Sequence, residues 1–232
     1  MIRLSASLLK DYIVCPRQAY YRINNSGEGL QTLAMSIGST AHSILEKYPF
    51  DKDGAFGAID STLERFVGKT TPSLKIQIEK YLNVYFDKFI HMVSEDDEIE
   101  KFFRVRFDNV EPVIVGKFDV VHNNDVIDWK TSKKLYNKME RDIQFIIYYL
   151  AYQKEYKRYP TNVFYASLHS GELHRFEPNP EIIKHFMEEV IPYAVQGLLS
   201  GYAPRYGLFN YSGYLCSKCT WRNLCLPECE LN

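Results

Sequence analysis

Apolar residues recur at three- and four-residue intervals along much of the chain, which is the spacing of amphipathic helices. The N-terminal stretch from Ser5 to Arg22 follows this pattern, and Pro16 predicts a break within it. The same spacing predicts five further helices, at residues 34–47, 54–67, 73–93, 138–156 and 181–199. Helical segments are therefore expected both before and after the middle of the chain.

Short runs of β-branched and aromatic residues replace the helical pattern in the middle of the chain. They predict a β-meander of three strands, at residues 102–107, 112–122 and 125–129. Asn123–Asn124 marks the turn between the last two strands, and the acidic run 95–98 predicts a solvated turn before the first. Two later runs, joined across Ser170–Gly171, predict a hairpin at residues 163–168 and 172–176. This order predicts an α/β fold with a central mixed β-sheet flanked by helices.

Composition places the chain among ordinary globular proteins. Its 232 residues suffice for one sizeable core, and 46% of them are hydrophobic and 25% charged. The net charge of −1 means that any binding of nucleic acid must rely on a local patch. The sequence has no apolar run long enough to span a membrane and no secretory cleavage signal, so we expect a single cytoplasmic domain over residues 1–232.

Two carboxylates end neighbouring predicted strands. Asp119 lies late in one strand and Asp128 closes the next, so pairing of the strands brings them together. Carboxylates held close together repel each other and favour a hard divalent cation such as Mg²⁺ or Mn²⁺. Lys130 shares a strand face with Asp128, where its ammonium can orient a water molecule or screen a phosphate. A surface ion pair is the alternative interpretation of the Asp-x-Lys pattern.

Two helices carry further candidates. His42 and Glu46 lie on one face of the predicted helix 34–47, where the imidazole is either a metal ligand or a partly buried structural group. Gln144 and Tyr148 have the same spacing in the predicted helix 138–156. They follow a set of cations that forms either a local phosphate-binding patch or a solvated helix start: Lys130, Lys133, Lys134, Lys138 and Arg141.

Taken in order, four motifs resemble the RecB-like nucleases of the PD-(D/E)xK superfamily: Gly38-x-x-x-His42, Gly116-x-x-Asp119, Asp128-x-Lys130 and Gln144-x-x-x-Tyr148. The resemblance covers about residues 5–229 and implies a restriction-endonuclease-like core with a helical insertion at about 54–100. It implies four metal ligands, which are the side chains of His42, Asp119 and Asp128 and the carbonyl of Trp129.

The resemblance also assigns roles to the remaining motif residues. Lys130 would activate the attacking water, while Gln144 and Tyr148 would position the DNA strand near the scissile phosphate. Glu46 would contact a metal ligand rather than the metal. The expected cofactor is Mg²⁺ or Mn²⁺.

Five cysteines, four of them within the last 17 residues, favour metal ligation over disulfides because their number is odd. Cys15 before Pro16, together with the three cysteines of Cys216-x2-Cys219-x5-Cys225, resembles the cluster-binding arrangement of the AddB-type and CRISPR-adaptation nucleases. That resemblance implies a [4Fe–4S] cluster that joins the C-terminal segment 206–232 to Cys15 and guides DNA. A zinc site is the alternative, made by Cys216, Cys219, Cys225 and Cys229.

The sequence thus predicts a metal-dependent DNA nuclease, and specifically an exonuclease acting on single-stranded or frayed ends in recombination, phage replication or CRISPR spacer processing. Since no helicase motif is present, unwinding would require a helicase or a recombination or adaptation partner. A phage origin and an oligomeric state are both compatible with the sequence. The alternatives are a DNA-binding scaffold without turnover and a zinc-stabilised binding protein.

Overall fold

The computed structural model describes residues 3–24, 32–107, 112–132, 139–204, 216 and 219–225. Its strands are β1 (Arg3–Ser5), β2 (Glu98–Val105), β3 (Val113–His122), β4 (Asp125–Lys130), β5 (Asn162–Ser167) and β6 (Leu173–Arg175). Its α-helices are α1 (Ala6–Val14), α2 (Pro16–Asn24), α3 (Leu33–Lys47), α4 (Lys52–Gly57), α5 (Ile59–Val67), α6 (Pro72–Val84), α7 (Ile143–Tyr156), α8 (Pro180–His185) and α9 (Ile191–Ser200). Shorter helical turns are η1 (Tyr85–Phe89), η2 (Ile90–Met92), η3 (Met139–Arg141) and η4 (Phe186–Val190).

The six described strands form one mixed sheet, with β3 at its branching point. β3 pairs along one side with antiparallel β2. Along its other side, the first part of β3 pairs with parallel β1 and the last part with antiparallel β4. The sheet continues through parallel β5 to antiparallel β6. The sequence-based prediction of a central mixed sheet is confirmed.

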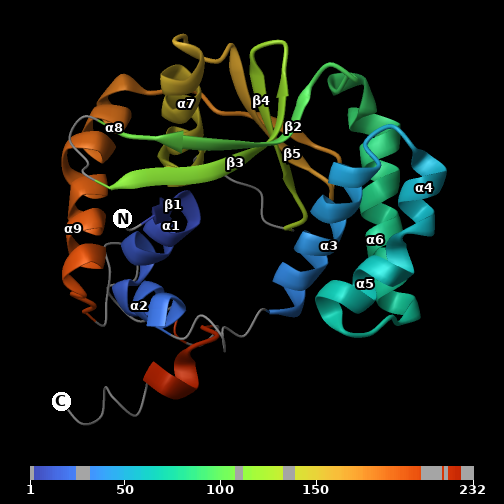
Figure 1. Cartoon of the computed structure of the whole chain (residues 1–232), viewed down its shortest axis with the longest axis horizontal. Helices are drawn as coiled ribbons and strands as arrows, with labels where there is room; N and C mark the ends of the chain where they lie inside the picture. Colours follow the sequence, from blue (N-terminus) through green and yellow to red (C-terminus); the bar gives the residue numbers. More distant parts are fainter. Residues whose placement is uncertain are drawn as a thin grey trace.

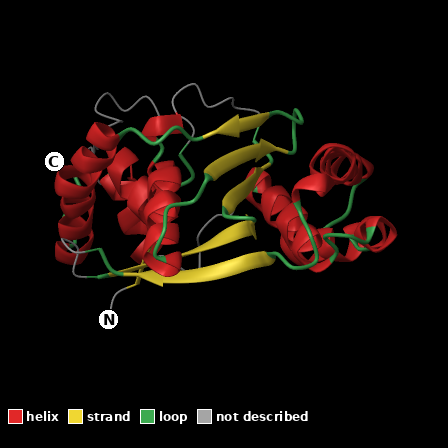
Figure 2. Ribbon diagram, turned by 90° about the horizontal axis from the view of Figure 1, so that it is seen from above, coloured by secondary structure: helices red, strands yellow, loops and turns green. Residues whose placement is uncertain are grey.

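Helices cover both faces of this sheet (Figures 1 and 2). On one face, α1, α7, α9 and η4 bury an apolar core that includes Leu9, Phe118 and Ile146. On the other face, α3, α5, α6 and η1 bury a second core that includes Ile44, Ile78 and Trp129. The prediction of a sheet flanked by helices is therefore also confirmed.

Local sequence explains where several helices begin and end. Ser5 caps α1 by accepting a hydrogen bond from the Leu8 amide at 3.1 Å, and Thr32 caps α3 in the same way. Pro16 interrupts the N-terminal helix as expected: α1 ends at Val14 and α2 begins at Pro16 itself. The cap at Thr32 thus sets the start of α3, the helix that carries His42.

The structure differs from several predicted elements. The helix predicted at 138–156 begins only at Ile143, after the 3-10 turn η3. β1 was not predicted, since three residues are too few to show a period and are ordered by pairing with β3. β2 begins at Glu98 rather than at residue 102, so a charged end of the strand had been interpreted as part of a turn. The helix predicted at 54–67 is divided at Ala58, and the one predicted at 73–93 ends in the π-helical and 3-10 turns η1 and η2.

The turns were predicted better than the strand ends. Asn123 and Asn124 both adopt positive φ between β3 and β4, which asparagine tolerates well. Gly171, with φ of 73°, forms the connection between β5 and β6. Among the described segments, no helix combines the length and the apolar character that crossing a membrane requires.

Candidate active site

The candidate site lies where β3 and β4 separate. The two strands pair from His122 opposite Asp125 to Val120 opposite Ile127. The next two residues in the same register are Asp119 and Asp128. Asp119 remains tied to the neighbouring strand because its Oδ2 accepts a hydrogen bond from the Trp129 amide at 2.7 Å. The expectation that strand pairing brings the two aspartates to one place is confirmed by this register.

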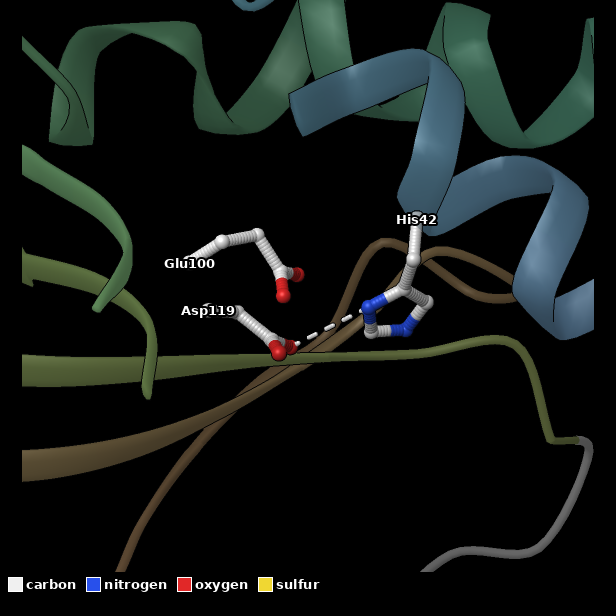
Figure 3. A group of neighbouring side chains, drawn as sticks. All are labelled: His42, Glu100 and Asp119. Carbon is white, nitrogen blue, oxygen red and sulfur yellow. Dashed lines mark ion pairs between the residues drawn. The ribbon is translucent and has the colours of Figure 1, made fainter. Parts of the chain in front are cut away.

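His42 approaches Asp119 from α3. Its Nδ1 lies 3.5 Å from the Asp119 Oδ2, with the imidazole partly exposed and the carboxylate largely buried (Figure 3). Gly38 lies one turn before His42 and allows α3 to pack close to the chain that follows β4. A Cβ at position 38 would lie only 3.2 Å from the Thr131 Oγ1. The glycine of the Gly-x-x-x-His motif thus has a packing reason.

Glu100 on β2 completes a group that the sequence did not reveal. His42, Glu100 and Asp119 each offer a ligand atom within 4.8 Å of the others, and in the described part of the chain they are the one set of three metal-capable side chains that does so. Figure 3 shows the three side chains converging from α3, β2 and β3. Glu100 has φ of 50°, a left-handed conformation that is costly outside glycine and that is found preferentially at functional sites.

Asp128 faces a different partner. Its two oxygens lie 2.9 and 2.7 Å from the Lys130 Nζ, and its side chain is only 1% exposed. Gln144 on α7 bridges the pair: its Nε2 donates to Asp128 at 3.0 Å and its Oε1 accepts from Lys130 at 3.2 Å. The structure therefore places Asp128 in the Lys130 pair rather than in the tight group of His42, Glu100 and Asp119.

Gln144 is in turn held by the start of α7. The Asp142 side chain caps this helix by accepting from the Gln144 amide at 2.9 Å, and Lys10 of α1 donates to Asp142 at 2.7 Å. The Gln144 Nε2 also donates to the Tyr148 hydroxyl at 2.8 Å. The Gln-x-x-x-Tyr motif thus supports the Asp128–Lys130 pair and connects it to α1.

The charges of His42 and Asp119 depend on each other. Burial opposes protonation of His42, but the adjacent Asp119 carboxylate outweighs it and raises the pKa of His42 to about 9. Burial likewise disfavours the Asp119 carboxylate, yet His42, Lys130 and the Trp129 amide together lower the pKa of Asp119. A cation at this position is therefore strongly favoured, and without a metal the imidazolium supplies it.

The Asp128–Lys130 pair shows the same competition. Burial raises the pKa of Asp128, more than the Lys130 ammonium lowers it. Burial alone would lower the pKa of Lys130, but Asp128 and Asp119 raise it. Lys130 therefore holds its proton at neutral pH, which suits a cation that contacts a phosphate or orients water.

A cleft of about 800 Å³ leads to this site. Helices α3 and α5 line it on one side and strands β2 and β3 on the other, with Glu46, Lys117 and Tyr148 among the lining residues. A second space, of about 10 Å³, lies directly beside His42, Glu100 and Asp119 and has the size that holds a single water molecule. A substrate that enters the cleft therefore meets the carboxylates at its floor.

The family model for the PD-(D/E)XK nuclease superfamily matches residues 3–226. The chain belongs to this superfamily. The match spans the segments that carry His42, Asp119 and the Asp128-x-Lys130 pair. No curated protein matches the sequence.

Among solved structures are chains similar to this PD-(D/E)XK nuclease. A crystal structure from Eubacterium rectale, named "Putative exonuclease", has a TM-score of 0.67 at 14% identity, over 96% of this chain and 88% of that one. A crystal structure of SSO0001 has a TM-score of 0.46 at 15% identity, over 96% of this chain and 85% of that one. At such low identity, the first likeness concerns the fold alone.

Cys15, Cys216, Cys219 and Cys225 of this PD-(D/E)XK nuclease do not line the cleft. Burial raises the pKa of the Cys219 thiol, and Cys15 and Cys216 lie close enough to raise it further. Tyr21 of α2 stacks on Trp221 with ring centroids 5.9 Å apart, and its hydroxyl donates to the Leu224 carbonyl at 3.4 Å. The described C-terminal residues 219–225 therefore contact α2.

One of the predicted phosphate-binding cations lies away from the site. Arg141 is exposed in η3 and does not line the cleft. Four further predicted site residues lie outside the described residues: Lys133, Lys134, Lys138 and Cys229.

Proposed function

We propose that this chain is a single-domain, metal-dependent DNA exonuclease of the RecB-like type. The observation that carries the proposal is the convergence of His42, Glu100 and Asp119 within 4.8 Å at the floor of a cleft, beside the buried Asp128–Lys130 pair. A surface ion pair would not require a strained glutamate, a helix brought close by Gly38 and a bridging Gln144. The arrangement therefore supports a hydrolytic centre.

The donor set fits a hard divalent cation. One imidazole nitrogen and carboxylate oxygens are ligands that Mn²⁺ accepts readily and that Mg²⁺ accepts with water completing its shell. His42, Glu100 and Asp119 would hold the ion, with Asp128 and the Trp129 carbonyl as the further ligands that the family resemblance suggests. When bound, the ion supplies charge stabilisation for the attacking and leaving oxygens of a phosphodiester.

The residues of the chain supply the rest of the chemistry. Lys130, kept charged by Asp128, orients the attacking water and contacts the scissile phosphate. Gln144 fixes the direction of the ammonium, since its Oε1 accepts from Lys130 while its Nε2 holds Asp128. Tyr148, which lines the cleft, contacts the DNA strand.

A comparison of linear and circular DNA substrates tests whether the protein acts at DNA ends. With Mg²⁺ or Mn²⁺, we expect the protein to degrade linear single-stranded DNA and duplexes with frayed ends, and to leave a covalently closed circle of the same sequence intact. End-labelled strands and gel electrophoresis measure both. Equal cleavage of circle and linear strand would make the enzyme an endonuclease. Binding of linear DNA without cleavage under any metal would favour the scaffold alternative.

We further propose that the cysteines hold a [4Fe–4S] cluster in the manner of the AddB-type and CRISPR-adaptation nucleases. Cys15 and Cys216 both lie close enough to Cys219 to raise the pKa of its thiol, which supports a site shared by these cysteines. A tetrahedral zinc site made by Cys216, Cys219, Cys225 and Cys229 is the alternative.

Cys15→Ser is expected to lose most of the iron and sulfide, because it removes the ligand from the N-terminal helix pair. Cys229→Ser is the matched control and is expected to keep the cluster. Iron, zinc and acid-labile sulfide are measured per chain after anaerobic purification, together with visible absorbance. One zinc per chain without iron, lost in Cys229→Ser and retained in Cys15→Ser, would establish the zinc alternative.

A further inference from the structure

The wall of the cleft opposite β2 and β3 carries an arginine that the catalytic group does not use. Arg65 and Phe66, in the last turn of α5, line the same cleft as His42 and Asp119. We propose that Arg65 binds a backbone phosphate of the DNA strand in the cleft and that Phe66 positions its guanidinium. This inference rests on the proposed function, because it assigns the contact that holds the substrate beside the metal group.

A DNA strand in this cleft requires a cation that is not already neutralised. The floor is acidic, with Glu46, Glu100 and Asp119 among the lining residues. The cations near the floor are paired with carboxylates: Lys117 lies 3.1 Å from Glu100, and Lys130 lies 2.7 Å from Asp128. Electrostatic repulsion would oppose entry of a polyanion unless another positive group faces the strand.

Arg65 meets this requirement. Its side chain is exposed and, within the described residues, makes no ion pair with a carboxylate. The guanidinium carbon lies 5.1 Å from the centroid of the Phe66 ring, a cation–π contact. Stacking restricts the guanidinium without using its N–H groups, so these donors stay available for the paired oxygens of a phosphate.

The helix that carries Arg65 packs against the helix that carries His42. α5 and α3 share an apolar core that includes Leu63, Ile59 and Ala41. A phosphate bound by Arg65 would therefore lie on the same packed pair of helices as His42. In this proposal α5 contributes a substrate contact to the cleft through Arg65, and α3 contributes a metal ligand through His42.

The test is binding of a 5′-fluorescent single-stranded oligonucleotide in EDTA, followed by anisotropy at several salt concentrations. Arg65→Gln is expected to weaken binding about 3- to 10-fold and to reduce the slope of log K against log salt by about 0.7, the value for one phosphate contact on a single strand. Arg65→Lys keeps the charge and should retain most of the affinity and slope. Phe66→Leu should fall between the wild type and Arg65→Gln.

Lys75→Gln is the matched control. Lys75 also lies in this helical region, but it pairs with Asp60 at 2.9 Å and does not line the cleft, so its removal should change neither affinity nor slope. Thermal unfolding checks that each variant is folded.

The proposal is overturned if Arg65→Gln binds as tightly and with the same salt slope as the wild type, or if Lys75→Gln has the same effect. Binding that depends on Arg65 in a protein without cleavage activity would support this contact while refuting the nuclease proposal. Wild-type protein that binds no DNA in EDTA would overturn the Arg65 contact, and wild-type protein that neither binds nor cleaves DNA with Mg²⁺ or Mn²⁺ would refute both proposals.

Discussion

Asp119→Asn is expected to abolish metal-dependent cleavage, with a loss of at least about 10³-fold. Asp119 is the carboxylate nearest His42 and the one held at the strand fork by the Trp129 amide. Asparagine keeps an oxygen that accepts this hydrogen bond but removes the negative charge that attracts a divalent ion. Loss of about 4 kcal/mol of metal-derived stabilisation corresponds to such a rate decrease. Calorimetric titration with Mn²⁺ and a cleavage assay measure the two effects.

Asp97→Asn provides a closely matched control. Asp97 also has a buried carboxylate facing a histidine, with His122 Nδ1 at 2.9 Å, but it is outside the cleft. We expect it to change stability and to leave metal affinity and cleavage near the wild-type values. Glu100→Gln, by contrast, should weaken Mn²⁺ binding. If the cleavage rate of Asp119→Asn stayed within a few-fold of the wild-type rate, Asp119 would not be part of the catalytic centre.

Lys130→Met is expected to reduce cleavage about 10²- to 10³-fold, the range for loss of one group that stabilises charge in the transition state. Methionine preserves much of the side-chain length, and Gln144 still holds Asp128. Mn²⁺ binding should therefore persist, because His42, Glu100 and Asp119 are unchanged. The signature of Lys130 is a fall in the single-turnover rate at saturating DNA without loss of metal, measured by rapid quench and calorimetry.

Lys101→Met is the corresponding control. Lys101 is paired with the carboxylate of Glu98 on β2 and does not line the cleft. Its removal should leave the single-turnover rate unchanged. If Lys130→Met lost metal binding together with cleavage, the role of Lys130 would be to maintain the ligand geometry rather than to act on water or phosphate.

Local signals in the sequence predicted much of the fold. The β-branched and aromatic run of β3, the asparagine turn after it and the break at Pro16 are all signals carried by neighbouring residues, and the predicted elements are present in the structure. β1 depends instead on pairing with residues more than a hundred positions away, at Val113–Val115. Nothing in a three-residue segment specifies that partner.

The sequence identified those candidate residues that belong to spaced motifs. His42 and Asp119 were selected from spaced motifs, and the structure brings them to 3.5 Å. Glu100 was missed because it follows an acidic run that looks like a solvated turn and because its positive φ interrupts the usual strand conformation. Arg65 was missed for another reason. Its position on the cleft wall depends on how α5 packs against α3, and no spacing along the chain encodes that contact.

The most direct test is cleavage of end-labelled DNA by the anaerobically purified wild type and by Lys130→Ala. The wild type should cleave with Mg²⁺ or Mn²⁺, stop in EDTA and recover when the metal is restored, while the folded variant binds the same DNA and leaves it intact. Cleavage that persists in EDTA, or that is equal in the two proteins, would contradict a metal-dependent centre built on the residues described here.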